Sequence, residues 1–106
     1  MVHERGRREV VDRGEVLAIR GADDYAELLL RDGRTRLLNE RLTSLAERLP
    51  DDFLRVHRSV IVNLRSVRSL NRRPGGGGEV SLDGGLCVPV GRTYAKALSA
   101  ATRRPT

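Results

Sequence analysis

The stretch from Phe53 to Leu64 constrains the fold of this chain more than any other part of its sequence. Its second half contains Val60, Ile61 and Val62, three β-branched residues that favour a strand. A polar cluster of Arg, His, Arg and Ser precedes them. The stretch therefore predicts a buried strand beside a group of cationic side chains, a surface suited to an anion such as a phosphate backbone.

The charges are unevenly distributed along the chain. Residues 1–54 contain ten Arg and twelve acidic residues, a net charge of −2, whereas residues 55–106 contain nine Arg and one Lys against two acidic residues, a net charge of +8. Six of these arginines lie between residues 55 and 73, a segment without Asp or Glu. An Arg-rich composition can reflect genomic base composition, but the gradient is steeper than composition requires. It predicts one basic face, as in nucleic-acid-binding proteins.

Length and residue types argue against several classes of protein. A chain of 106 residues is long enough for one domain with a small core. Cys87 is the only cysteine, which precludes an internal disulfide and indicates a reducing compartment, and we expect a buried thiol there. His3 and His57 lack partners at ligand spacing, so we expect no metal and no cofactor. No nucleophile–base pair or carboxylate pair can be assembled, which argues against an enzyme.

Hydropathy argues against a membrane location. No apolar run approaches the roughly 20 residues that cross a bilayer. The N-terminus, which is rich in Arg, has no hydrophobic core of the kind found in signal peptides. We therefore expect a cytoplasmic protein.

Apolar runs and turn residues predict a mostly β fold. Besides the strand within 53–64, we expect strands at 8–11, 15–19, 25–31, 34–38, 79–82 and 86–90. Asp32-Gly33 is a two-residue hairpin signal of the type that accepts positive φ at both positions. The continuous apolar run 28–30 indicates a strand covered on both faces. The glycine run 75–78 lacks the Lys-Ser/Thr and the helix of a phosphate-binding loop, and we interpret it as a loose hairpin connection.

One helix is predicted between Asn39 and Leu49, with Asn39 as N-cap and Pro50 as its end. Its apolar residues recur at i, i+3, i+4 and i+7, a stripe for core packing, namely Leu42, Leu45, Ala46 and Leu49. A second, Ala-rich helix is expected over 91–98, followed by a tail over 99–106.

The ordered set of these features resembles a LytTR-type DNA-binding domain. The features are Asp24-Tyr25 before an apolar strand, Asp32-Gly33, a helix ending at Arg48-Leu49-Pro50, the stretch 53–64, Asp83-Gly84, and Val88-Pro89-Val90-Gly91-Arg92 followed by Tyr94. The resemblance covers about Arg8 to Leu98. It implies stacked antiparallel sheets with one or two short helices, and a transcription regulator that reads direct repeats in promoter DNA through loops placed in successive major grooves.

Two departures from the family pattern matter. The family usually has another N-terminal strand, for which only Val2–Glu4 is available, so we expect an incomplete sheet or a truncated N-terminus. The sequence also contains no receiver domain, so we expect any control of binding to come from elsewhere.

The resemblance implies DNA contacts from three places. These are the loop at Tyr25, the turn with His57 and Arg58, and the end of the last strand with Arg92, one helical turn before Lys96. The residues themselves agree in part, since an Arg fork can bind O6 and N7 of guanine and small hydroxyls can contact phosphate. We expect the DNA-binding residues to be Tyr25, Arg55, His57, Arg58, Ser59, Arg92, Thr93 and Lys96.

Structural roles remain open for some of these residues and their neighbours. His57 could be a satisfied surface group and Tyr25 a ring that covers the sheet. Asn63 is expected to close a turn with its side chain, and Phe53 to fasten the helix to the core. Four further arginines could form a solvated edge that keeps strands from pairing with neighbours, namely Arg65, Arg68, Arg72 and Arg73. Of these, Arg65 and Arg68 are expected at most to neutralise phosphate.

Two other functions compete with the regulator. One is an RNA-binding β domain, although single-stranded RNA recognition needs stacking aromatics and the chain has only three aromatic residues. The other is a stand-alone protein-interaction module that antagonises a related regulator. The expected partners are therefore double-stranded promoter DNA and either a second copy on DNA or a related regulator.

Overall fold

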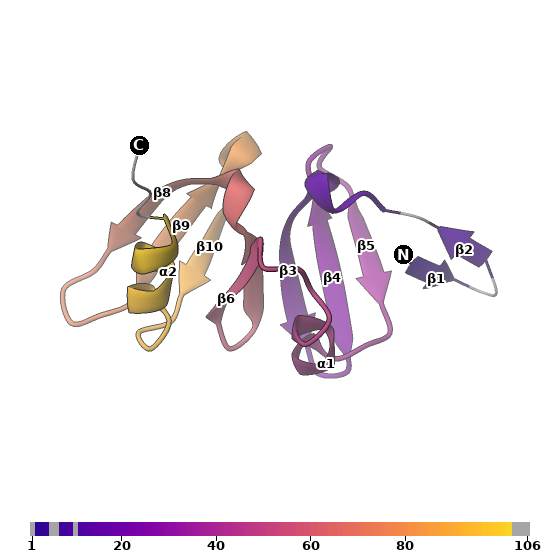
Figure 1. The fold of residues 1–106 in the computed structure, drawn as a ribbon, viewed down its shortest axis with the longest axis horizontal. Coiled ribbons are helices and arrows are strands. Elements are labelled where there is room, and N and C mark those ends of the chain that lie inside the picture. Colours follow the sequence, from indigo (N-terminus) through magenta and orange to yellow (C-terminus); the bar gives the residue numbers. More distant parts are fainter. Residues whose placement is uncertain (1, 5–6, 10, 103–106) are drawn as a thin grey trace.

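A computed structural model describes residues 2–4, 7–9 and 11–102 of the chain (Figure 1). The strands are β1 (Val2–Glu4), β2 (Arg7–Glu9), β3 (Val16–Ala22), β4 (Tyr25–Leu30), β5 (Thr35–Leu38), β6 (Phe53–His57), β7 (Val60–Asn63), β8 (Val67–Arg72), β9 (Gly78–Leu82) and β10 (Cys87–Val90). The helices are α1 (Leu42–Ala46) and α2 (Ala95–Thr102), with 3-10 turns η1 (Arg13–Glu15), η2 (Leu64–Ser66) and η3 (Asp83–Gly85).

The strands described form antiparallel sheets. A five-stranded sheet has the order β5-β4-β3-β7-β6, and a three-stranded sheet has the order β10-β9-β8. β1 and β2 form a separate hairpin, so Val2–Glu4 pairs with Arg7–Glu9 and adds no strand to the larger sheets. The expectation of a mostly β fold with two short helices is confirmed.

Alternating side chains of the five-stranded sheet pack into two separate cores. Ala18, Leu29 and Val62 face the three-stranded sheet and α2. Ile19 and Ile61, with Leu28 and Leu30 beside them, face the opposite way and pack under α1. The apolar run 28–30 is therefore covered on both faces, as predicted. Phe53 packs against the cluster under α1, as also predicted.

The connections between strands gather at two ends of the molecule (Figure 1). The turns at 23–24, 58–59, 73–77 and 91–94 lie at one end, which we call the loop end. This grouping follows from the strand register, because the paired residues Ala22–Tyr25, His57–Val60 and Val90–Gly78 end their strands next to these turns. The hairpin at 31–34 and the three 3-10 turns lie at the other end, which we call the clasp end.

Several element boundaries differ from the predictions. α1 begins at Leu42 rather than after Asn39, and its N-cap position is Arg41, which makes no capping hydrogen bond with its side chain. Residues 91–94 form a turn, and α2 runs from Ala95 to Thr102. The tail expected over 99–106 is therefore wrong for residues 99–102, which are helical. The strand expected at 8–11 is β2, which ends at Glu9. Of the last two residues expected in this strand, Val10 lies outside the described residues, and Val11 is described but is not in a strand.

The hairpin at Asp32-Gly33 has a longer loop than predicted. The Leu30 amide donates to the Arg34 carbonyl at 2.9 Å, and the Gly33 amide donates to the Leu30 carbonyl at 3.0 Å. Gly33 has a φ of +88°, but Asp32 does not have positive φ, since Asp23 is the only described non-glycine residue that does. Asp32 instead accepts a hydrogen bond from the Arg34 amide at 2.9 Å, which holds a three-residue loop with one left-handed glycine.

Cys87 is exposed, which corrects the expectation of a buried thiol. Val88 and Val90 point into the core between the sheets. Because successive side chains of a strand point to opposite faces, Cys87 points outward with Pro89. The apolar neighbours of this cysteine hid the alternation in the sequence.

Candidate nucleic-acid interface

The β6–β7 turn holds the imidazole of His57 in one tautomer. The Ser59 amide donates to Nδ1 of His57 at 3.1 Å, and the Ser59 hydroxyl lies 2.9 Å from the same nitrogen. Since Nδ1 accepts from a backbone amide, the ring proton is on Nε2. The turn therefore occupies Nδ1, and Nε2–H is the remaining donor of the neutral ring.

Arg55 supports this turn from within the sheet. Its Nε donates to the His57 carbonyl at 3.3 Å, and its guanidinium also donates to the Arg58 carbonyl. These bonds direct the Arg55 side chain to the backbone of the turn. The side chain of Arg58 is exposed at the tip of the turn.

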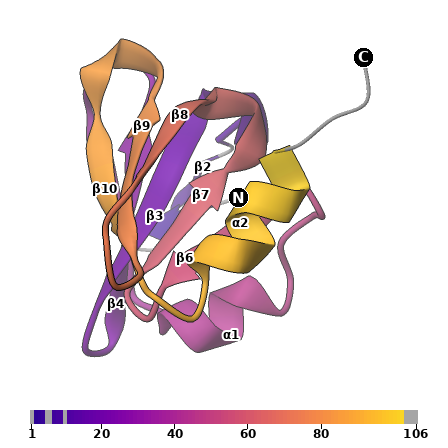
Figure 2. The same ribbon diagram turned by 90° about the vertical axis from the view of Figure 1, so that its left-hand side faces the viewer.

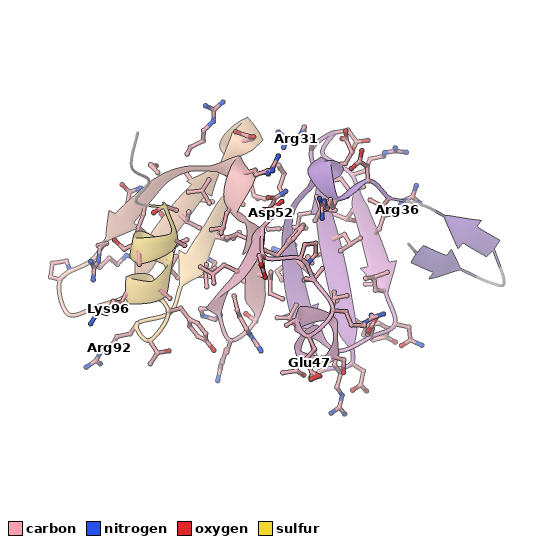
Figure 3. The ribbon with its side chains drawn as sticks, viewed as in Figure 1. Arg31, Arg36, Glu47, Asp52, Arg92 and Lys96 are labelled. Carbon is pink, nitrogen blue, oxygen red and sulfur yellow. The ribbon has the colours of Figure 1, made fainter. Side chains whose placement is uncertain are left out.

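The loop between β10 and α2 lies directly beside the β6–β7 turn. The Gly91 amide donates to the Val56 carbonyl at 2.7 Å, and a Cβ at Gly91 would lie 3.8 Å from Cα of His57. Arg92 and Thr93 follow Gly91 and are exposed. Figure 3 shows Arg92 and Lys96 pointing away from the ribbon together, at the loop end.

The glycine run packs against Arg92. A Cβ at Gly76 would lie 2.5 Å from Cγ of Arg92, and a Cβ at Gly77 would lie 3.1 Å from the Val90 carbonyl oxygen. Hydrogen bonds join Arg73 and Gly77, and Gly76 and Arg73, each at 3.1 Å. The run is thus a hairpin connection, as predicted, but it is a closed turn that supports Arg92 rather than a loose one.

The β3–β4 turn completes the loop end. The Gly21 amide donates to the Ser59 carbonyl at 2.8 Å, which fastens the end of β3 to the β6–β7 turn. Tyr25 begins β4 and is 48% exposed, so its ring is not covered by the sheet. All eight expected site residues therefore lie at one end of the molecule, although Arg55 faces the backbone of the turn.

Sequence reasoning missed two residues at this end. Arg41 and Asp24 form an ion pair, with Arg41 Nε 3.0 Å from Asp24 Oδ1. Both line a groove of ≈ 850 Å³ together with Arg55, Arg58 and Ser59. Arg41 was assigned to the expected helix, and only the fold brings the start of α1 next to the β3–β4 turn (Figure 2). The Asp24-Tyr25 pair was the one available signal.

At the clasp end, two aspartates pair with three arginines. Asp83 accepts from Arg31 at 2.7 Å and lies 2.6 Å from Nε of Arg68. The hydrogen bond from Arg31 is the main reason that the pKa of Asp83 lies below its usual value, and the charge of Arg68 adds to it. Arg65 lies 3.2 Å from Asp52. Arg31 also donates to the Ser66 hydroxyl at 3.3 Å, so the cluster joins the two sheets.

Asn63 closes the turn into η2, as predicted. Its Oδ1 accepts from the Arg65 amide at 3.0 Å, and its Nδ2 donates to the Val16 carbonyl at 2.9 Å. Both polar ends of this buried side chain are therefore satisfied. The residue has a structural role at the clasp end.

The described residues contain neither a metal-binding cluster nor a membrane-spanning helix. No group of three His, Cys, Asp or Glu side chains in that part of the chain could hold a metal ion. Among the same residues, no helix has the length and apolar character needed to span a bilayer.

Comparisons with known proteins agree with this architecture. The family model described as LytTr DNA-binding domain matches residues 6–103. The CO-responsive transcriptional regulator RcoM of Rhodospirillum rubrum is 40% identical over 86 residues, which is 79% of this chain and 36% of the regulator. The sensory transduction protein LytT of Bacillus subtilis is 29% identical over 90 residues, 84% of this chain and 37% of that protein. This chain therefore spans about a third of the length of these relatives.

A solved structure is also similar. It is the LytTr DNA-binding domain of a Bacillus cereus protein described as a methyl-accepting/DNA response regulator. The TM-score is 0.76 at 26% identity, over 85% of this chain and 83% of the other. The stacked sheets and their connections thus have a counterpart in an experimental structure.

Proposed function

This chain belongs to the LytTR family of DNA-binding domains, and we propose that it binds specific promoter sites in double-stranded DNA through its loop end. Regulation of transcription is the activity named for the RcoM relative. We extend that activity to this chain, with the loops entering successive major grooves of directly repeated half-sites. A homodimer on DNA is the assembly that such repeats favour.

The observation that carries this proposal is the placement of cations without partners. Within residues 11–102, Arg58, Arg92 and Lys96 have no ion pair with a carboxylate. Arg58 lies in the β6–β7 turn, and Figure 3 shows Arg92 and Lys96 at the loop end. By contrast, Arg65 and Arg68 of the same basic segment are paired. The projecting loops therefore present three cations without a carboxylate partner among the described residues, which suits contact with phosphates and bases.

The geometry supports distinct roles for these side chains. Arg92 rests on the glycine turn, so its guanidinium is presented outward to bind O6 and N7 of guanine. Arg58 is placed to read a second base. Nε2–H of His57 is a donor for a base acceptor or a phosphate oxygen. The remaining contacts, mainly to phosphate, come from Tyr25, Ser59, Thr93 and Lys96, while Arg55 holds the turn.

RNA binding is less well supported by the same surface. Single-stranded RNA is recognised largely by stacking on aromatic rings. Phe53 packs in the cluster under α1, and the ring of Tyr94 packs on Gly91. Tyr25 is the one aromatic side chain that is largely exposed among the described residues. A single ring gives no stacking platform.

A binding titration tests the proposal. Sites are first selected from a pool of random duplexes, and fluorescence anisotropy then measures affinity for a selected and a scrambled duplex over a range of salt. We expect tighter binding to the selected duplex. Five to seven phosphate contacts would give a slope of log K against log salt of about −5 to −6. Absence of duplex binding at low salt, or tighter binding to single-stranded RNA, would overturn the proposal.

A further inference from the structure

A groove separates the β6–β7 turn from the β3–β4 turn and the start of α1, and it carries an ion pair. Arg41 and Asp24 form one wall, and Arg58 and Ser59 belong to the other. The Gly21–Ser59 hydrogen bond of 2.8 Å fixes the separation of the two walls at the base. Figure 2 shows α1 and the turn preceding β4 at the same end of the molecule. Any anion bound at Arg58 would therefore lie at the edge of this groove.

The ion pair is easily opened. Its side chains are 69% exposed on Arg41 and 68% exposed on Asp24, and Arg41 contributes one nitrogen, Nε, to the contact. Exposed pairs of this kind contribute little stability because water screens both charges and two long side chains must be ordered. The guanidinium nitrogens outside this contact remain available to a second acceptor.

Asp24 gives Arg41 the same kind of acceptor that a phosphate would give it. A carboxylate and a phosphodiester both present anionic oxygens to an Arg fork, and both form charge-assisted hydrogen bonds with it. A phosphodiester near Arg58 would also be attracted by the positive charge of Arg41 and repelled by that of Asp24. The groove thus contains an arginine whose present acceptor is an internal substitute for the nucleic-acid backbone.

Building on the proposed function, we propose that Arg41 is a fourth contact point of the interface, which takes a DNA phosphate in exchange for Asp24. In the free domain Asp24 holds Arg41. On DNA the phosphate in the groove replaces the carboxylate, and Asp24 moves out to solvent. Asp24 therefore lowers affinity for all duplexes, while Arg41 raises it, and neither residue selects a base.

Salt-dependent titrations of single variants give the first test. Arg41→Ala should lower the salt slope by about 0.9, the value for one phosphate, with equal effect on selected and scrambled duplexes. Arg41→Lys should keep the slope, since it keeps the charge. Asp24→Asn should raise affinity about two- to fivefold, the range expected when an exposed ion pair no longer competes. An unchanged slope in Arg41→Ala would overturn the proposal.

A double-mutant cycle separates exchange from simple repulsion. If Asp24 acts through Arg41, the gain from Asp24→Asn should disappear in the Arg41→Ala background. If the same gain persists there, Asp24 only repels DNA and the exchange is wrong. Thermal unfolding of each variant should match the wild type, because both side chains are exposed.

The pair Asp32–Arg34 is a matched control. It lies at the opposite end of β4, with Arg34 Nε 2.8 Å from Asp32 Oδ2 and side-chain exposures of 70% and 48%. Arg34→Ala and Asp32→Asn should leave both slope and affinity unchanged. Equal effects from both pairs would mean that net charge alone is measured, which overturns the proposal. A wild-type domain that fails to bind any duplex contradicts the proposed function itself, and this result is distinct from an Arg41 variant that binds like the wild type.

Discussion

At the clasp end, Arg31 and Arg68 lie within 2.7 Å of Asp83, whereas at the loop end Arg58 and Arg92 have no carboxylate partner among the described residues. Both ends draw on the same Arg-rich sequence. The clasp end uses Arg31 and Arg68 in a cluster that joins the two sheets, and the loop end leaves Arg58 and Arg92 without a carboxylate in the described part of the chain. The basic segment 55–73 is therefore not one uniform basic face, because acidic residues from other segments neutralise part of it.

The two ends also differ in how they use glycine. Gly33 of the clasp end and Gly76 of the loop end both have left-handed backbones, with φ of +88° and +108°. A Cβ at Gly33 would meet nothing within 4 Å, whereas a Cβ at Gly76 would collide with Arg92. The first glycine therefore serves the turn alone, and the second also makes room for a side chain that we assign to base reading.

The largest expected effect is at Arg92. Arg92→Ala should cost about 1–3 kcal/mol on the preferred duplex and relax the preference at one position, because a bidentate contact to guanine is lost. The measurement is affinity for the selected duplex and for single-base variants of it. Equal losses on selected and scrambled duplexes would show that Arg92 holds only the backbone.

The two glycines give a paired test of the next largest effect. Gly76→Ala and Gly33→Ala should each lower the free energy of unfolding by about 1 kcal/mol, because alanine disfavours positive φ. DNA affinity should fall several-fold for Gly76→Ala alone, since the new methyl displaces Arg92. Denaturant unfolding and anisotropy titrations measure the two quantities. The support assigned to the glycine turn would be wrong if both variants bound DNA like the wild type.

A smaller effect is expected at Arg68. Arg68 is paired with Asp83 at the clasp end, so its charge is already partly neutralised. Arg68→Ala should therefore weaken binding to all DNA sequences alike and change the salt slope by less than one unit. The same titrations used for Arg92→Ala measure this slope. A loss of preference for the selected duplex would break the distinction between the two ends.

The smallest effect concerns stability and pH. Hydrogen bonding from Arg31 and the charge of Arg68 lower the pKa of Asp83 from its ordinary 3.8. A lowered folded-state pKa gives stability that is present above 3.8 and is lost as pH falls through the folded value. Asp83→Asn should therefore lower the Tm slightly at neutral pH, and the difference from the wild type should narrow in acid. A difference that stays constant through acid would contradict a role for the carboxylate charge.

The sequence by itself determined the family and the local structure. β-branched residues at 60–62 and the apolar run 28–30 predicted strands buried in the sheet, and Asn63 was correctly assigned to closing a turn. These properties depend on side-chain alternation and on hydrogen bonds between near neighbours, which sequence spacing records directly. Most residues of the candidate site were proposed from the sequence, because His57 and Arg58 lie in one short motif.

Only the tertiary structure decided which cations are available. Arg31 and Asp83 are 52 positions apart, and Arg41 and Asp24 are 17 apart. The glycine run lies next to Arg92 only because β9 pairs with β10. Cys87 was misplaced for a related reason, since its exposure depends on which face of the three-stranded sheet is covered. A sequence records the charge of each side chain, but the distance to an opposite charge, and so its neutralisation, is set by strand register and sheet packing.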